Sequence, residues 1–318
     1  MNAQELKSNV ILLLAAAIWG FAFVAQRIGA NYLGSFTFNG IRFALGGLSL
    51  IPVILFFGNK NGKNGKKDAK EQIQIKEKEK AKSSKKDTVI AGIVAGIVLF
   101  AAASLQQIGL VDSSAGKAAF ITGLYLVIVP ILGIFLKQYI HLTTWIGIFM
   151  AISGLYFLCV TDNMTISKSD LILVLGAFFW ALHILLIDHF VKKIDALKLS
   201  FCQFLTCSAL SMAAAMIFEH ITLDGIIQAI VPILYGGVCS VGVAYTLQAI
   251  GQKHAKPSHA AIVLSMESVF ASLGGWIILK ENLGLRGYMG CALMMCGMLM
   301  AQVQNFSKNN AEVINSIN

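Results

Sequence analysis

Residues Ser104–Ile121 read SLQQIGLVDSSAGKAAFI, and residues Thr246–Val263 read TLQAIGQKHAKPSHAAIV. Six positions are identical at an offset of 142 residues, and apolar runs flank both copies. The correspondence extends to Gly147 and Gly154 with Gly290 and Gly297, at an offset of 143, and to Trp19 with Trp180, at an offset of 161. A long charged loop, present only in the first copy, explains the larger offset. The sequence therefore contains two copies of one structural unit.

The composition indicates that both copies lie in lipid. Apolar residues make up 57% of the 318 residues, and charged residues only 13%, whereas soluble domains carry about 25% charged residues. A helix needs about 20 apolar residues to cross the hydrocarbon core of a bilayer. The sequence predicts ten such helices, at 9–27, 37–57, 88–110, 115–137, 142–160, 169–190, 198–218, 228–251, 257–279 and 285–303.

The predicted fold class is an all-α integral membrane protein with ten transmembrane helices, arranged as two inverted five-helix repeats. Because five is an odd number, the second repeat must enter the membrane upside down relative to the first. Inverted repeats are typical of secondary transporters, whose central site is exposed alternately to each side. The predicted units are 9–160, with a basic cytoplasmic loop at 58–87, then 169–303, and a cytoplasmic tail at 304–318.

The basic residues indicate membrane orientation and argue against a nucleic-acid partner. The net charge is +9, but eleven of the 25 lysine and arginine residues lie in one loop between Asn59 and Asp87. No platform of aromatic and basic residues accompanies them. If the N-terminus is inside, nineteen of the 25 lie on the inner side and five on the outer side. The positive-inside rule therefore predicts a multi-pass protein of the cell membrane with both termini cytoplasmic.

Four stretches resemble the EamA-type ten-helix proteins of the drug/metabolite transporter superfamily. They are LLLAAAIWGFAFVAQR (Leu12–Arg27), FNGIRFALGGL (Phe38–Leu48), SAGKAAFITGLYLVIVPILG (Ser114–Gly133) and SMESVFASLGGWIILKENL (Ser265–Leu283). The resemblance covers nearly the whole chain apart from the basic loop and the tails. It implies a carrier of amino acids, amines, nucleosides or other metabolites. One departure is Lys137-Gln138, which stands where the family's fourth helix ends in Gly-Glu.

Glu267 and Arg42 are charged residues within predicted spans. A charge there costs at least about 2.5–3.5 kcal/mol on insertion scales, so it needs a partner or a water-filled cavity. Glu267 can bind a cationic group of the substrate, carry a coupling proton, or form a structural hydrogen bond. Arg42 can contact a substrate carboxylate, snorkel, or pair with a helix end. The two side chains can also pair with each other.

The repeat identifies further candidates for substrate contact. Tyr125 corresponds to Glu267 at the offset of 142, which predicts that the two face each other across the pseudo-two-fold axis. The other candidates are the repeat mates Trp19 and Trp180, the repeat mates Gln106 and Gln248, and His183 in the sixth predicted helix. A buried Gln can also simply join two helices, and a lone His is often a structural hydrogen-bonding group.

Charges near the helix ends are predicted to be interfacial. Lys117, at the start of the fourth helix, is expected to snorkel, and Lys280 and Glu281 are expected to lie at the interface or cap a helix. The six cysteines have no metal-ligand spacing, and no nucleotide-binding GxxxxGK[ST] loop is present, so no metal or cofactor is expected.

The predicted function is secondary transport of a small metabolite, such as an amino acid or amine, by alternating access, with export as the expected direction. The driving force is a proton gradient or the substrate's own gradient, and the protein is a monomer or homodimer. Two alternatives stay open. A membrane-embedded enzyme would have to use a cluster such as His183, Asp188 and His189, and a non-transporting membrane sensor would move no solute.

Overall fold

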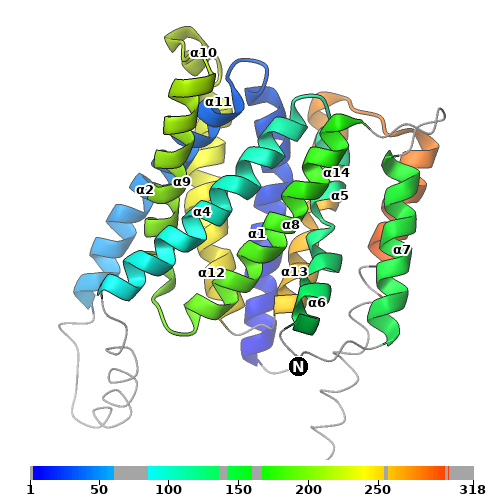
Figure 1. The fold of residues 1–318 in the computed structure, drawn as a ribbon, viewed down its shortest axis with the longest axis horizontal. Coiled ribbons are helices and arrows are strands. Elements are labelled where there is room, and N and C mark those ends of the chain that lie inside the picture. The colour runs from blue at the N-terminus through cyan, green and yellow to red at the C-terminus, as the bar shows by residue number, and fades with distance from the viewer. Residues whose placement is uncertain are drawn as a thin grey trace, which may run out of the picture.

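In the computed structural model, the described residues are 3–60, 85–135, 142–159, 167–253, 257–297 and 300, and they form a helical bundle (Figure 1). The predicted tail at 304–318 and most of the predicted loop at 58–87 lie outside the described residues. The first half contains α1 (Ala3–Gly29), α2 (Ser35–Lys60), α4 (Lys85–Leu110), α5 (Ala115–Thr122), α6 (Tyr125–Phe135) and α7 (Leu142–Cys159). The second half contains α8 (Lys168–Val191), α9 (Ala196–Phe218), α10 (Leu223–Gln228), α11 (Ile230–Leu234), the π-helix η1 (Tyr235–Tyr245), α12 (Thr246–Gln252), α13 (Pro257–Ser265), α14 (Glu267–Gly274), the π-helix η2 (Gly275–Leu279) and a last helix at 284–297.

The helices have the length and surface of membrane spans. Seven described helical runs are long and apolar enough to cross a bilayer: Leu6–Gly29, Ser35–Leu55, Lys85–Leu110, Ala115–Gly133, Lys168–Val191, Ala196–Phe218 and Ile230–Gln252. Trp145–Gly154 and Val263–Leu279 are shorter apolar helices. Large apolar side chains such as Phe149, Met216 and Leu285 are more than 70% exposed, which is unfavourable in water but expected against lipid. The prediction of an all-helical membrane protein is confirmed.

The first helices of the two halves run in opposite directions. Near the end of α1, Gln26 accepts a hydrogen bond from Gln106 in the last turns of α4, at 3.1 Å. In the first turn of α5, Lys117 pairs with Asp170 in the first turn of α8. Because a short turn joins α4 to α5, α1 ends where α8 begins. We refer to this end, the upper one in Figure 1, as the Asp170 end, and to the opposite one as the N-terminal end.

The packing of one half is repeated by the other. The equivalent helices α2 and α9 pack along each other, α8 packs along α4, and α1 packs along η1 and α12, which correspond to α4. The last helices, α7 and 284–297, also meet through equivalent glycines. A Cβ on Gly154 would lie 2.6 Å from the carbonyl oxygen of Gly290, and a Cβ on Gly297 would overlap the backbone of Gly147. Close approach of these helices therefore requires residues without side chains.

The fourth and ninth spans are interrupted at equivalent positions. The sequence predicted a continuous helix at 115–137 and another at 257–279, but α5 is separated from α6 at Gly123–Leu124, and α13 is separated from α14 at Met266. The second segments consequently begin at Tyr125 and Glu267, which are repeat mates. Broken spans in transporters occur where the backbone faces a cavity.

Candidate functional site

A cavity lies among the broken spans and the helices around them. It has about 430 Å³ of space that no protein atom occupies, and nearly all of its lining side chains are buried. The lining residues come from both halves: Trp19, Phe23, Gln26, Arg42, Gln106, Thr122, Tyr125, Trp180, Ile184, Ser240, Tyr245, Gln248, Leu264 and Glu267.

Tyr125 and Glu267 meet at the centre of the pseudo-symmetric arrangement. The Tyr125 hydroxyl donates a hydrogen bond to the Glu267 carboxylate, with 3.0 Å between Oη and Oε1. The neighbouring Ser268 hydroxyl donates to the Ala119 carbonyl at 3.0 Å, which ties α14 to α5. Two hydrogen bonds therefore join the fourth and ninth spans, and the second one holds Tyr125 and Glu267 near each other. Glu267 is 5% exposed, so its carboxylate is available only to a molecule inside the cavity.

Arg42 is the other charged residue in the cavity wall, and its side chain is incompletely paired. Its Nε donates to the Asn39 side chain at 2.9 Å, and Asn39 in turn donates to the Ala103 carbonyl at 3.0 Å. The guanidinium also lies over the rings of Phe38 and Phe43, 5.6 and 5.0 Å from their centroids. Its Nη2 atom, however, is buried without a hydrogen-bond partner. Arg42 forms no ion pair with Glu267, so two opposite charges are held apart in one cavity.

Aromatic rings form one wall. Tyr245 contacts Trp19, with ring centroids 4.7 Å apart, and stacks on Trp180 with centroids 6.1 Å apart. The Trp19 indole N–H donates to the Ser240 carbonyl at 3.2 Å, within the π-helix η1. The Trp180 indole nitrogen is buried without a partner. Buried indole nitrogens usually find an acceptor, so the Trp180 N–H is a donor that the described residues leave unused.

Glutamine side chains join helices and also line the cavity. Gln106 donates to Gln26, and Gln107 donates to the backbone carbonyl of Gln26 at 3.1 Å, so these amides join α4 to α1. Gln248, the repeat mate of Gln106, also lines the cavity. Gln106 therefore does both things that the sequence suggested for it: it joins two helices through Gln26, and it lines the cavity where a solute could bind.

His183 does not reach the cavity wall. It is fully buried, its Nε2 lies 2.9 Å from the Gln203 side-chain oxygen, and its ring stands edge-on to Trp180 and Tyr245. His183 therefore supports the aromatic wall from outside the cavity. Among the described residues, no group of three or more His, Cys, Asp or Glu side chains could hold a metal ion.

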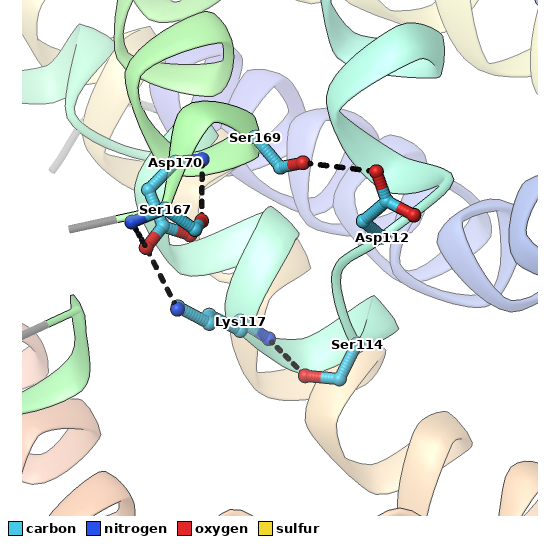
Figure 2. A network of polar contacts seen from close by, with 6 residues as sticks. All are labelled: Asp112, Ser114, Lys117, Ser167, Ser169 and Asp170. Carbon is cyan, nitrogen blue, oxygen red and sulfur yellow. Dashed lines mark hydrogen bonds and ion pairs between the residues drawn. The ribbon is translucent and has the colours of Figure 1, made fainter. Parts of the chain in front are cut away.

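Lys117, which the sequence predicted to snorkel at the interface, has a specific partner. Figure 2 shows its ammonium reaching Asp170, and the Nζ–Oδ2 distance is 2.8 Å. The Asp170 side chain is only 2% exposed. The sequence did not predict this ion pair, because Asp170 lies 53 residues away in the other half and only the helix packing brings the two together. Glu281, predicted to be interfacial or capping, does cap a helix: both its oxygens accept from the Ala115 backbone N–H, at 2.9 and 3.0 Å.

Sequence reasoning missed several residues of the cavity wall. The polar ones are Gln26, Thr122, Ser240 and Tyr245. Gln26 carried a usable signal, since an amide within an apolar span is costly without a partner. Tyr245 carried little signal, because one tyrosine in an apolar run is unremarkable until its five ring neighbours are known.

Known proteins share this architecture and sequence. A model of the EamA-like transporter family matches residues 6–160 and again residues 167–302. An "Uncharacterized transporter" of Archaeoglobus fulgidus is 26% identical over 304 residues, covering 95% of this chain and 88% of that protein. "Uncharacterized transporter YoaV" of Bacillus subtilis is 22% identical over 289 residues, covering 89% and 92%.

A solved crystal structure, described only as that of a protein, superposes with a TM-score of 0.68 at 16% identity, covering 94% of this chain and 97% of that one. This similarity concerns the fold alone. The matched family is one of transporters and not of enzymes. With two family matches that together span nearly its whole length, the chain belongs to the EamA-like transporter family.

Proposed function

We propose that this transporter is a secondary carrier of zwitterionic metabolites of the amino acid class, working by alternating access. The observation that carries the proposal is the separation of Glu267 and Arg42. Both line one buried cavity, they form no ion pair with each other, and Arg42 retains an unpaired nitrogen. Because an isolated buried charge is costly, a solute with opposite charges at its two ends would complete the pairing of both residues.

The cationic end of such a solute fits the Glu267 side of the cavity. Glu267 accepts one hydrogen bond from Tyr125, and a carboxylate has acceptor capacity for several more. The faces of Trp19, Trp180 and Tyr245 line the same space, and aromatic faces attract ammonium groups. An ammonium group could therefore pair with the Glu267 carboxylate and contact the aromatic rings at the same time.

The anionic end fits the donors left without partners. Arg42 Nη2, Trp180 Nε1 and the Thr122 hydroxyl are buried, line the cavity and lack a hydrogen-bond partner among the described residues. Arginine suits carboxylates because its donors match the two oxygens. Buried polar groups are generally hydrogen-bonded, and a bound carboxylate would give acceptors to these donors of the cavity lining.

The rest of the lining favours a solute with an apolar side chain. Phe23, Ile184 and Leu264 complete the wall and are at most 2% exposed. Polar side chains placed against them would lose hydrogen bonds to water without replacement. We therefore favour large apolar amino acids over strongly polar ones.

Counterflow into proteoliposomes tests the proposal with matched probes. Vesicles are loaded with leucine, leucinamide, 3-methylbutylamine or N-acetylleucine, and uptake of radiolabelled leucine is measured. Leucine should drive exchange, whereas the three analogues, which lack the carboxylate or the ammonium charge, should not. If 3-methylbutylamine drives exchange equally well, the substrate class is simple amines and not zwitterions. No exchange with any metabolite in a wider panel would favour the non-transporting sensor. Loading from each side also tests the expected export direction.

Proton coupling by Glu267 is a separate part of the proposal. Its support is the position of a buried carboxylate that lines the cavity and is hydrogen-bonded to its repeat mate. Flux is compared with and without a pH gradient, in the wild type and in Glu267→Gln. If the mutant retains gradient-driven flux at the wild-type level, Glu267 is not the proton carrier and the substrate gradient becomes the driving force.

We further propose a cell-membrane location with both termini cytoplasmic, supported by the lysine distribution. Under this orientation the Asp170 end faces outward. A cysteine-reactive, membrane-impermeant reagent applied to cells carrying Asn31→Cys, an exposed position at the Asp170 end, should label that residue from outside.

Either a monomer or a homodimer is compatible with the proposal, and mass measurement in nanodiscs separates them.

A further inference from the structure

Two glycines mark equivalent points in α4 and in η1. A Cβ on Gly96 would lie 2.5 Å from the β-carbon of Thr206 in α9, and a Cβ on Gly237 would lie 2.7 Å from that of Leu45 in α2. Thr206 and Leu45 are repeat mates at the offset of 161. Gly96 and Gly237 therefore pack against equivalent positions of equivalent helices, and they are 141 residues apart.

A second pair of glycines gives a different offset further along the same spans. A Cβ on Gly109 in α4 would lie 2.6 Å from the Leu173 side chain, and a Cβ on Gly251 in α12 would lie 2.7 Å from the Leu12 side chain. Leu173 and Leu12 are again repeat mates at the offset of 161, but Gly109 and Gly251 are 142 residues apart. Between the two pairs of glycines, the second half therefore contains one residue more than the first.

The extra residue coincides with the π-helix η1. The first-half helix α4 is α-helical from Lys85 to Leu110, whereas its counterpart is π-helical from Tyr235 to Tyr245. A π-helix forms hydrogen bonds between residues i and i+5, one residue further apart than in an α-helix, so it accommodates an inserted residue between two helical segments. Short π-helices occur frequently at functional sites. The insertion therefore gives this segment a geometry that α4 does not have.

The π-helix adds two residues to the cavity lining. Of the residues of α4, all of which the structure describes, only Gln106 lines the cavity, and its repeat mate Gln248 lines it from α12. The π-helix η1 contributes Ser240 and Tyr245 in addition. The residue 142 positions before Tyr245 is Ala103, which is small and is not part of the lining. The cavity is therefore less symmetric than the repeat that builds it.

Tyr245 occupies the middle of the aromatic wall. Its ring centroid lies 4.7 Å from that of Trp19 and 6.1 Å from that of Trp180, and both of these rings line the cavity. Phe43 and Phe204 are fully buried, are not part of the lining, and pack against the same ring with centroids 6.0 and 5.7 Å away. The space left for a solute therefore depends on where the backbone of η1 places the Tyr245 ring.

Two hydrogen bonds between the halves hold η1 against α1. The Trp19 indole N–H donates to the Ser240 carbonyl at 3.2 Å, and the Tyr235 hydroxyl donates to the Ile18 carbonyl at 3.0 Å. Each helix thus supplies one donor and one acceptor. The related contact between α8 and α4 lacks the first of these bonds, because the Trp180 indole nitrogen has no partner among the described residues. The bond from Trp19 therefore accompanies the π-helix and not the continuous α-helix.

We propose that the residue inserted in η1 makes Tyr245 the specificity-determining residue of the cavity. The insertion makes the segment π-helical and places the Tyr245 ring in the lining, where it limits the side chain that a bound solute can carry. Trp19 and Tyr235 are positioning residues, since they act by holding η1 against α1. The inference rests on the proposed transport of amino acids and adds the group that selects among them. Such a solute has a charged end and an apolar side chain, so it needs a cavity whose walls differ.

The test compares leucine with the larger tryptophan in counterflow by the full-length protein. Deletion of Val238 gives η1 the spacing of α4. Val238→Ala is the matched control, because it changes the same side chain, which is 41% exposed, and keeps the spacing. Tyr245→Ala removes the ring from an unaltered helix. Trp19→Phe keeps a ring but removes the donor to the Ser240 carbonyl, and Tyr235→Phe removes the other donor.

Tyr245→Ala should raise the half-saturation concentration for leucine about tenfold and lower that for tryptophan, because the ring no longer contacts the smaller side chain and its volume becomes available to the larger one. Deletion of Val238 should give the same change. Trp19→Phe and Tyr235→Phe should give a smaller change in the same direction, and Val238→Ala none. The ratio between the two solutes does not depend on how much protein folds. A wild-type ratio in Tyr245→Ala, or in both Trp19→Phe and Tyr235→Phe, would overturn the proposal.

A spectroscopic readout separates this inference from the proposed function. The indole N–H signal of Trp19 is followed by nitrogen-15 NMR in nanodiscs and is identified by its loss in Trp19→Phe. Deletion of Val238 should shift this signal and speed its exchange with heavy water, because the Ser240 carbonyl moves away. If that variant does not fold, Tyr235→Phe replaces it in the measurement. An unchanged signal would overturn the proposal. If the wild type exchanges neither amino acid, the proposed substrate fails, while the NMR result still decides whether the insertion positions η1.

Discussion

The central cavity and the Asp170 end both bury charged side chains, but they pair them differently. In the cavity, Glu267 has one hydrogen bond from Tyr125, and Arg42 keeps a buried nitrogen without a partner. At the Asp170 end, Lys117 and Asp170 lie 2.8 Å apart, and Glu281 accepts a backbone hydrogen bond with both oxygens. At the Asp170 end the charged groups are paired with each other or with the backbone, although Asp170 Oδ1 is buried without a partner among the described residues. In the cavity, Arg42 has a donor left without a partner and forms no ion pair with any described residue.

The difference separates two reasons for keeping a charge inside a membrane protein. A charge in a membrane is costly, so each needs a compensating role. Paired charges between helices can stabilise one arrangement of those helices, whereas incompletely paired charges in a cavity can bind a ligand. Changing residues in each region should therefore affect different measurements: transport for the cavity, and stability or conformation for the Asp170 end.

The largest effect is expected from Glu267→Gln. Loss of the charge that would bind an ammonium group should lower the counterflow rate of leucine about 10- to 100-fold, because hydrogen bonds to charged groups contribute about 1.5–3 kcal/mol. Tyr125→Phe keeps the carboxylate and is the matched control, with a smaller loss expected. If the Glu267→Gln protein shows wild-type counterflow, the Glu267 carboxylate does not bind the substrate and has a structural role, as the acids of the Asp170 end do.

Arg42→Lys should have the next largest effect. Lysine keeps the charge but not the planar donor arrangement, so the half-saturation concentration for leucine should rise about tenfold. Folding is checked by the melting temperature in detergent. The control solute is leucinamide, which lacks the carboxylate: any residual binding of it should be insensitive to this substitution. Equal weakening for both solutes would mean that Arg42 supports the fold through Asn39 and does not contact a carboxylate.

A double-mutant cycle on Lys117→Met and Asp170→Asn should give a moderate effect on stability. We expect a coupling of about 1–2 kcal/mol in the free energy of unfolding, since the pair is largely buried but lies near the end of the bundle. Unfolding in mixed micelles measures it. Coupling near zero would show that the pair is as weak as a solvent-exposed one.

The smallest effect is expected from Asp188→Asn. Its partner Lys192 is more than half exposed and lies one turn away in the same helix. Such pairs contribute about 0.3–0.5 kcal/mol, so stability and transport should both stay close to wild type. A loss comparable to that of Asp170→Asn would mean that burial does not distinguish the two ion pairs.

Much of the fold could be predicted because its signals are local or repeated. Apolar runs of span length gave the described helices within a few residues, and the 142-residue repeat related Tyr125 to Glu267 before their contact was known. The interruptions at Gly123–Leu124 and Met266 were not predicted. Each lies in an apolar run that is long enough for one continuous helix, so the length of the run does not reveal the interruption.

The sequence predicted several of the residues that line the site, but it did not predict which residues these contact. Its unusual residues, charges and aromatic groups inside spans, stood out because lipid makes them costly. The partners of Arg42 and Lys117 did not, since Asn39 is one of many polar residues near helix ends and Asp170 belongs to the other half.

The sequence by itself determined that this protein spans a membrane as two related, inverted units, because burial in lipid requires apolar helices and an odd repeat reverses direction. It also identified the few charged residues within the spans, which are candidates for function because a charge in lipid is costly. Only the tertiary structure decided that Arg42 and Glu267 share a cavity without pairing, that His183 lies outside it, and that the acids Asp170 and Glu281 connect the halves at one end. The physical reason is that pairing between charges falls off within a few ångströms, and such distances between remote segments are set by helix packing.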